Sequence, residues 1–244
     1  MSIQIDPIGI IRTPYKQKFA IPRQPGLVKS AQGQIEFSAA YQDPNALRGI
    51  EQFSHIWLIF HFHQTAAQGW SPLVRPPRLG GNAKQGVFTT RSTFRPNAMG
   101  LSVVEFDSVS YTQGQLRLHV NGIDLLDGTP ILDIKPYIPY ADALPEARGG
   151  FANDAPPQME VIFSPSAEQQ LARWTKQHPN LATLITEVLA QDPRPAYKVL
   201  KESDALFGMN LYALNIQWQV SGGINCVVNI EAATCANTAN PEHF

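Results

Sequence analysis

The first 150 residues contain a succession of strand-like segments with almost no sequence at helical spacing between them. Residues 53–63 are dense in aromatic and β-branched side chains, as expected of a buried strand. Residues 103–109 and 115–120 form a predicted strand pair around the polar turn Tyr111-Thr112-Gln113-Gly114. Because no helices separate these strands, we expect a mainly β protein with an antiparallel β-barrel rather than a doubly wound parallel sheet. Shorter strand candidates are residues 8–11 and 86–90.

The composition changes at residues 145–157, where prolines and glycines among small polar residues indicate a linker. After the linker, a helix is expected to begin with Ser164 or Ser166 as its N-cap. A second helix over residues 181–189 places four apolar residues on one face, namely Leu181, Leu184, Ile185 and Val188. Two strands are predicted at residues 211–220 and 224–230. The predicted parts are a β-barrel domain (1–150), a small α+β domain (157–235) and a flexible tail (236–244).

Charge is unevenly distributed along the chain, although the net charge is only -1. Residues 1–100 carry 11 basic against 4 acidic side chains, whereas residues 101–160 carry 3 against 9. A nearly neutral protein with this distribution can still present a basic surface to a polyanion. The alternative is that blocks of sequence do not correspond to faces of the folded protein.

Several common classes of protein are disfavoured by the sequence. It contains no phosphate-binding loop of the form G-x-x-x-x-G-K-[ST], no dinucleotide-binding G-x-G-x-x-G after a strand, no H-E-x-x-H and no G-x-S-x-G. The longest apolar run, residues 56–60, is far shorter than the ~20 residues of a membrane helix. The first residues lack a signal-peptide pattern, and two cysteines cannot form a disulfide scaffold. We expect a cytoplasmic protein.

The segment from Phe88 to Ser102 contains two arginines, several hydroxyl groups and the turn-forming residues Pro96, Asn97 and Gly100. This composition predicts a long ordered loop. Arg91 and Arg95 are always charged, and each can bind a carboxylate or phosphate with two parallel hydrogen bonds. The alternative is a surface loop whose arginines form salt bridges with acids elsewhere in the chain.

Three aspartates lie within ten residues of one another, among aliphatic side chains, at positions 124, 127 and 133. A carboxylate in this setting can hold a ribose hydroxyl or an amino group. For Asp127 we favour a structural role, because Asp127-Gly128-Thr129-Pro130 has the composition of a turn whose aspartate bonds its own backbone.

His61 and His63 are two residues apart, so on a strand they would face the same side. No third ligand stands at a persuasive position, and we predict pocket or core histidines and no metal site. A further polar cluster, Asp192-Pro193-Arg194-Pro195-Ala196-Tyr197-Lys198, follows the second predicted helix. It is either a functional cluster or a helix stop with a solvated ion pair.

Taken together, these segments resemble the TrmO family of bacterial tRNA methyltransferases, also called TsaA-like proteins. The similarity spans nearly the whole chain and is weaker at residues 199–208 and after Glu231. The residues that carry it are Ile8–Tyr15, Pro22–Leu27, Phe53–His55, Phe62–Gln64, Arg75–Gly81, Thr90–Asn97, Asp127–Pro130, Asp133–Tyr137 and Asp192–Tyr197.

The resemblance implies an S-adenosylmethionine-dependent enzyme that methylates the exocyclic N6 of threonylcarbamoyladenosine, beside the anticodon of tRNA-Thr. It also implies a β-barrel methyltransferase domain, a small C-terminal domain and a homodimer. Two alternatives stay open: methylation of another acceptor, and a protein that binds the methyl donor in a sensing or regulatory role.

The resemblance further implies a set of site residues. For the methyl donor these are Gln24, Pro25, Gly26, His63, Gln64, Arg91, Leu101, Ile123, Asp124, Leu125 and Leu126. Arg91 is expected to bind the methionine carboxylate, while Leu101 and residues 123–126 are expected to hold the adenine. As catalytic candidates we name Asp192 and Tyr197, with Arg194 binding the threonyl carboxylate or a phosphate. Arg95 and Asn97 are the alternative substrate-binding residues.

Overall fold

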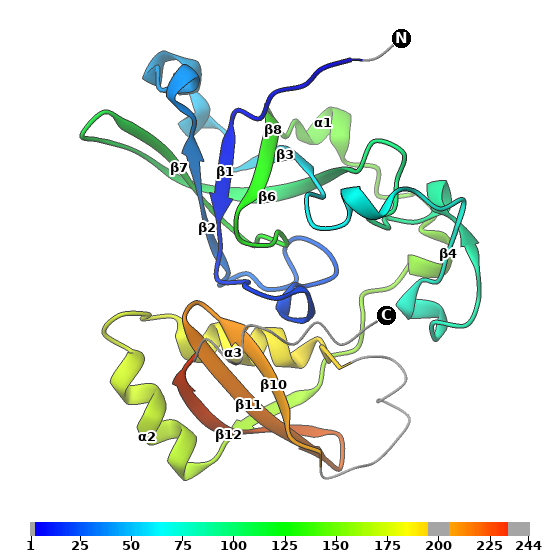
Figure 1. The fold of residues 1–244 in the computed structure, drawn as a ribbon, viewed down its shortest axis with the longest axis vertical. Coiled ribbons are helices and arrows are strands. Elements are labelled where there is room, and N and C mark those ends of the chain that lie inside the picture. Colours follow the sequence, from blue (N-terminus) through cyan, green and yellow to red (C-terminus); the bar gives the residue numbers. More distant parts are fainter. Residues whose placement is uncertain (1–2, 195–204, 234–244) are drawn as a thin grey trace. The chain divides into compact units, whose positions relative to one another are not determined.

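A computed structural model describes residues 3–194 and 205–233 of the chain. Its contacts divide the chain into two compact units, each with a sheet of its own (Figure 1). The first unit comprises Met1–Thr13 and Gln24–Ala155, and the second comprises Pro14–Arg23 and Pro156–Phe244. In the part of the chain that the structure describes, no helix has the length and apolar character needed to span a membrane.

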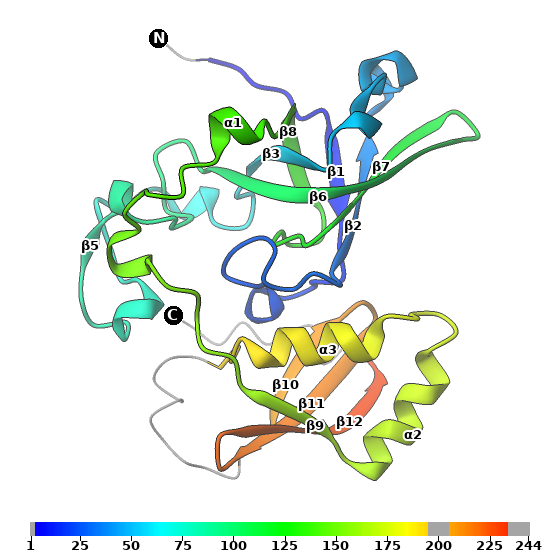
Figure 2. The ribbon, with the colours of Figure 1, turned by 180° about the vertical axis from the view of Figure 1, so that it is seen from behind.

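The first unit is built on a closed six-stranded barrel with the strand order β1-β2-β7-β6-β3-β8, visible from both sides in Figures 1 and 2. Every neighbouring pair in the barrel is antiparallel, which confirms the predicted fold class. The strands are β1 (Gly9–Arg12), β2 (Gln32–Phe37), β3 (His55–His61), β6 (Met99–Thr112), β7 (Gln115–Asn121) and β8 (Thr129–Pro136).

The barrel interior is filled by aliphatic side chains that alternate along the strands. On β3, Ile56, Leu58 and Phe60 are buried, whereas the residues between them are partly exposed. The predicted pair of strands is confirmed as the β6–β7 hairpin, in which Thr112 faces Gln115. Its two loop residues, Gln113 and Gly114, have φ of 53° and 76°, as a tight hairpin turn requires.

Gly100 allows two aromatic rings to pack against β6. A Cβ atom at this position would lie 2.3 Å from Cζ of Phe60 and 2.9 Å from Cζ of Phe62. These two rings pack edge to face, with centroids 5.2 Å apart. A glycine is therefore required here by close packing and not by backbone conformation.

Residues 62–98 leave the barrel after β3 and return to it at β6. They contain η5 (Ala66–Gln68), β4 (Leu73–Val74), η6 (Pro77–Leu79), β5 (Gln85–Gly86) and η7 (Val87–Thr89). The strand predicted at residues 86–90 is therefore wrong beyond Gly86. The hydroxyl groups of Thr89 and Thr90 donate to the carbonyls of Gly86 and Val87, and such local bonds favour a turn over a strand.

The second unit contains a four-stranded sheet with the order β10-β11-β12-β9. Its elements are β9 (Glu160–Phe163), α2 (Pro165–Trp174), α3 (Leu181–Ala190), β10 (Phe207–Leu211), β11 (Leu214–Ser221) and β12 (Ile224–Ala232). Ser164 is the N-cap of α2, because its hydroxyl accepts from the backbone nitrogen of Ala167. All four residues of the predicted apolar face of α3 are buried.

The strand predicted at residues 211–220 is wrong at its beginning. Tyr212, with φ of 54°, lies in a turn that separates β10 from β11. The same turn holds an early segment of the chain, since the Tyr212 nitrogen donates to the Pro14 carbonyl at 2.7 Å. Tyr15 forms a β-bridge with Leu211 and is fully buried, so this segment is part of the smaller unit.

Of the remaining short elements, one lies in the Pro14–Arg23 segment, three lie between β2 and β3, and two follow β8. They are η1 (Lys18–Ala20), η2 (Ala39–Tyr41), η3 (Pro44–Leu47), η4 (Ile50–Gln52), α1 (Pro139–Asp142) and η8 (Gly150–Ala152).

Candidate active site

Two glycines bring the Gln24–Gly26 turn against the loop that joins β7 to β8. The Gly26 nitrogen donates to the Gly122 carbonyl at 2.8 Å, and both glycines have positive φ, 75° and 70°. A Cβ atom on Gly122 would lie 3.4 Å from the Gly26 Cα. The sequence stretches 24–26 and 123–126, both predicted to bind the methyl donor, are therefore neighbours in the barrel unit.

Arg91 reaches this same place from the loop that follows η7. Its guanidinium donates a hydrogen bond to the side-chain oxygen of Gln24. Within the described residues Arg91 has this neutral amide as its partner and no ion pair, contrary to the alternative of a salt-bridged loop. The positive charge of Arg91 also favours the ionised form of Asp124, and this is one of the contributions that lower the pKa of that carboxyl group. A cation with a neutral, exchangeable partner is suited to binding an anionic group.

Asp124 carries the most strongly perturbed carboxyl group of the site. Burial raises its pKa to about 6, against the opposing effect of a hydrogen bond from Ser102 and of the Arg91 charge. Ser102 Oγ donates to Asp124 Oδ1 at 2.7 Å, and Ser102 is 2% exposed. Ser102 was absent from the predicted set, although its alternation with Gly100 and Val104 along β6 indicates a side chain that points into the barrel.

The expected adenine-binding residues differ in accessibility. Leu101 is 53% exposed on β6, whereas Ile123 and Leu125 are almost completely buried in the barrel core. The carbonyl of Leu125 accepts from the Thr13 hydroxyl at 3.0 Å. The side chains of Ile123 and Leu125 therefore belong to the barrel core, and Leu101 is the exposed apolar side chain of the expected set.

Asp127 has a structural partner in the barrel. Its carboxylate accepts from the Thr13 backbone nitrogen at 2.9 Å, at the end of β1. The Thr129 nitrogen and hydroxyl both bond to the Leu126 carbonyl, so a turn forms at residues 126–129, one residue earlier than predicted, and the Asp127 carboxylate bonds the backbone of a distant strand end. The turn is therefore stabilised both by its own hydrogen bonds and by the bond between Asp127 and the end of β1.

Arg95 organises its own loop. Its guanidinium donates to the carbonyls of Val87 and Thr90, at 3.2 and 2.8 Å, and lies 5.8 Å from the centre of the Phe88 ring. These contacts hold the loop that carries Arg91 and give Arg95 a structural role. Asn97, in the same loop, is exposed.

His63 lies just beyond β3 and is partly buried. Burial lowers its pKa, with a smaller contribution from the charge of His61. One ring nitrogen, Nε2, is 3.3 Å from the side-chain nitrogen of Gln64. No group of three metal-ligating side chains occurs among residues 3–194 and 205–233.

In the smaller unit, Asp192 and Arg194 form a double hydrogen bond of 2.6 and 2.9 Å. The helix stop and the ion pair of the second alternative are both present, since α3 ends at Ala190, but the pair is largely buried rather than solvated: the side chains of Arg194 and Asp192 are 9% and 22% exposed. The Arg194 guanidinium also lies 5.9 Å from the centre of the Phe207 ring, and Asp192 raises its pKa. Tyr197, the third predicted residue of this cluster, lies outside the described residues.

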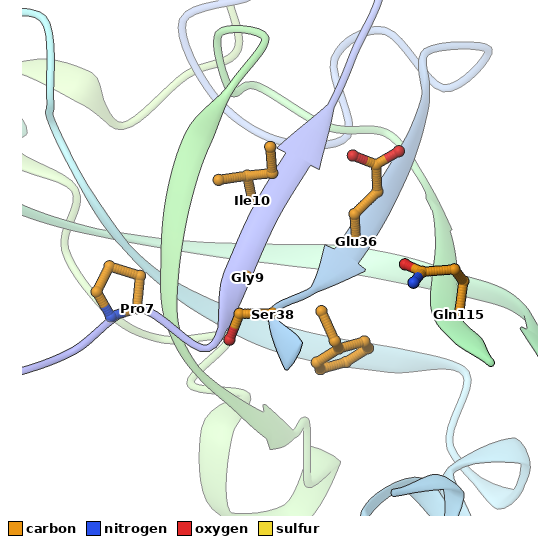
Figure 3. A pocket seen from close by; sticks show the side chains of 7 residues that line it. Pro7, Gly9, Ile10, Glu36, Ser38 and Gln115 are labelled. Atoms are coloured by element: carbon orange, nitrogen blue, oxygen red, sulfur yellow. The ribbon is translucent and has the colours of Figure 1, made fainter. Parts of the chain in front are cut away.

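A separate pocket lies where β1 begins and β2 ends (Figure 3). Its lining residues are Pro7, Gly9, Ile10, Glu36, Phe37, Ser38 and Gln115. None of the predicted site residues is among them. Glu36 is paired with Arg12 at 2.8 Å, so the carboxylate of this pocket already has a cationic partner.

Comparison with known proteins gives consistent matches over both units. The model of the tRNA-methyltransferase O N-terminal domain matches residues 10–143, and that of the TrmO C-terminal domain matches residues 156–233. The curated tRNA (adenine(37)-N6)-methyltransferase of Escherichia coli K12 is 51% identical over 221 residues, which are 90% of this chain and 94% of that protein.

Two further relatives come from Pseudomonas aeruginosa. A protein with the provisional name S-adenosylmethionine-dependent methyltransferase RcsF is 47% identical over 89% of this chain and 93% of its own length. A crystal structure of TrmO superimposes with a TM-score of 0.80 and 39% identity, covering 95% of this chain and 99% of that chain. With matches of this extent in sequence and in fold, the chain belongs to the TrmO family.

Proposed function

We propose that this protein transfers a methyl group from S-adenosylmethionine to the exocyclic N6 of threonylcarbamoyladenosine, next to the anticodon of tRNA-Thr. The observation that carries the proposal is the 51% identity, over nine-tenths of the chain, to a tRNA (adenine(37)-N6)-methyltransferase. The site in the barrel unit supports it, because Gln24, Arg91 and Asp124 come together there from three distant parts of the sequence.

The charges of Arg91 and Asp124 suggest how the methyl donor is bound. S-adenosylmethionine, when bound, supplies an electrophilic methyl group on a sulfonium. Arg91 would bind a carboxylate with two parallel hydrogen bonds in exchange for its bond to Gln24. Asp124 is ionised above pH 6 and has acceptor capacity beyond its bond to Ser102, so it can accept from an ammonium or a ribose hydroxyl. Leu101 offers apolar surface to the adenine.

For the acceptor, the Asp192–Arg194 pair is our candidate group. In the nucleoside, N6 is conjugated with the purine and the carbamoyl group, so its lone pair is a weak nucleophile. Removal of its proton by a carboxylate or tyrosinate assists attack. We assign Asp192 or Tyr197 to this role and Arg194 to the threonyl carboxylate or a phosphate. Arg194 would then exchange one strong partner, Asp192, for another.

Alignment of the two reactants is expected to provide most of the rate acceleration, on the order of several kcal/mol. An in-line transfer needs no covalent intermediate with the protein. It needs a fixed donor, a fixed acceptor and the exclusion of water. We further infer that the protein works in the cytoplasm as a homodimer, which the family resemblance supports and light scattering in solution tests.

The decisive experiment measures transfer of tritium from labelled S-adenosylmethionine to tRNA-Thr, with and without prior threonylcarbamoylation. Label that appears only on the threonylcarbamoylated tRNA supports both the reaction and the acceptor. Label on both tRNAs indicates a different acceptor atom. Donor binding without transfer to either tRNA contradicts the proposal and favours a sensing role.

The catalytic assignment has its own test. Asp192→Ala and Tyr197→Phe are expected to lower the transfer rate and to leave the dissociation constant of the donor unchanged. Turnover at the wild-type rate in both variants would remove these residues from the mechanism.

A further inference from the structure

The segment between β3 and β6 carries basic side chains and no acidic ones. Residues 52–104 contain no aspartate or glutamate, although the chain has 20 of them. The same stretch carries five arginines and lysines, namely Arg75, Arg78, Lys84, Arg91 and Arg95. Arg75 and Lys84 are exposed and belong to none of the contacts that build the donor site. This part of the barrel unit therefore presents positive charge that no acid of its own segment offsets.

Large apolar side chains are exposed on the same segment. Trp70 is 56% exposed and Phe88 is 73% exposed. Their stretches of chain are joined, because the Val87 nitrogen donates to the Pro72 carbonyl at 3.0 Å and Leu73 pairs with Gly86. Two large aromatic side chains exposed on joined stretches of one small folded piece are a candidate site of interaction.

The Phe88 ring is held in place from one side. The Arg95 guanidinium lies 5.8 Å from the ring centre and is itself fixed by the carbonyls of Val87 and Thr90. With nearly three-quarters of the residue exposed, the ring has room for a second planar group. A cation against one face of an aromatic ring and a nucleobase against the other is an arrangement suited to single-stranded nucleic acid.

We propose that this surface binds the unpaired bases of an RNA loop, with Phe88 and Trp70 as stacking platforms and Arg75 and Lys84 as phosphate contacts. The inference rests on the proposed function, in which the acceptor nucleoside lies in an anticodon loop. RNA is favoured over a protein partner because the segment lacks acidic side chains and combines cations with aromatic rings. Stacking is tolerant of base identity, so this surface would contribute affinity more than sequence preference.

The test compares RNA affinities of Phe88→Leu and Trp70→Ala with the wild type. Both variants are expected to bind the anticodon stem-loop of tRNA-Thr about five- to a hundredfold more weakly, and to bind a fully paired RNA duplex as the wild type does. Phe88→Leu keeps an apolar side chain and removes only the aromatic face. The dissociation constant of S-adenosylmethionine is expected to stay the same in Trp70→Ala. In Phe88→Leu, the bonds from Arg95 to the Val87 and Thr90 carbonyls are expected to keep the Arg91 loop in place.

Tyr140→Ala is the matched control. Tyr140 is 92% exposed but lies in a stretch that contains Asp142 and Glu146, so its loss should not change RNA affinity. Arg75→Ala combined with Lys84→Ala should reduce the slope of affinity against salt concentration, whereas the aromatic variants should leave the slope unchanged.

Three results would overturn the inference. If both aromatic variants bind the stem-loop with wild-type affinity and still methylate tRNA, the RNA-binding role of this surface is rejected, whereas the proposed function is not contradicted. A change of molar mass in Phe88→Leu with unchanged RNA affinity would make the surface a contact between copies of the chain. A wild-type protein that neither prefers the stem-loop nor methylates tRNA would reject both proposals.

Discussion

The Ser102 hydroxyl on β6 donates a 2.7 Å hydrogen bond to the Asp124 carboxylate in the loop between β7 and β8. This bond favours the ionised carboxylate, but burial has the larger effect, and the pKa of Asp124 rises to about 6. The balance between one hydrogen bond and the surrounding apolar core sets the pH at which this group becomes a negative charge. The charge of the Asp124 carboxyl group therefore changes near pH 6.

Donor binding is predicted to weaken as the pH falls below about 6. Above that value Asp124 is ionised and can hold a cationic or hydroxyl group of the ligand, whereas below it the carboxyl is protonated and the attraction is lost. Titration calorimetry between pH 5 and pH 8 would measure the effect. Asp124→Asn should bind weakly throughout this range and show a flatter profile. An unchanged midpoint in Asp124→Asn would assign the pH dependence to another group.

Ser102→Ala is predicted to move the midpoint of that profile to higher pH. The hydrogen bond from Ser102 lowers the pKa of Asp124, so its removal raises the pKa further. Ser102→Thr keeps the hydroxyl and should restore the wild-type midpoint if the extra methyl group is accommodated. A general loss of affinity without a change of midpoint would show that Ser102 acts only through packing.

Arg91→Ala is predicted to weaken donor binding by about tenfold or more, because a charge-assisted hydrogen bond contributes ~1.5–3 kcal/mol. Arg91→Lys should recover only part of the loss, since an ammonium cannot form the paired contact. The control is a donor analogue without the methionine carboxylate, which wild type and Arg91→Ala should bind with similar affinity. An equal loss for both ligands would place Arg91 elsewhere than at the carboxylate.

Gly100→Ala is predicted to destabilise the protein by about 1–3 kcal/mol, as expected for overpacking in a core. The added methyl group would lie 2.3 Å from Cζ of Phe60, a buried ring without room to withdraw. Thermal or denaturant unfolding would measure the change. Gly86→Ala is a suitable comparison, because its Cβ would meet no atom closer than 3.8 Å and its φ of -60° suits alanine.

Local patterns in the sequence predicted the elements whose contacts are local. The turn at Gln113-Gly114, the N-cap at Ser164 and the apolar face of α3 each depend on residues close together in the chain. The prediction of a strand at residues 86–90 is wrong because the hydroxyls of Thr89 and Thr90 donate to carbonyls three residues earlier in the chain. Such bonds favour a turn, and β propensity does not take them into account.

The centre of the candidate site is harder to predict from residues alone. Gln24 and Arg91 are 67 positions apart, and Ser102 and Asp124 are 22 apart, so no spacing rule connects them. The motifs identified most of these residues through their family resemblance. They missed Ser102: alternation along β6 indicates that its side chain points into the barrel, but its partner Asp124 is known only from the fold.

The bridge between Tyr15 and Leu211 has a consequence for how the protein is made. Tyr15 is buried against a sheet whose strands β10, β11 and β12 come much later in the sequence than the whole barrel. While the ribosome is still translating, residues 14–23 must wait for their partners, although the barrel on either side of them can already close. Until β10 has been made, Tyr15 lacks the strand that buries it, so the smaller unit can close only after all barrel strands have been synthesised.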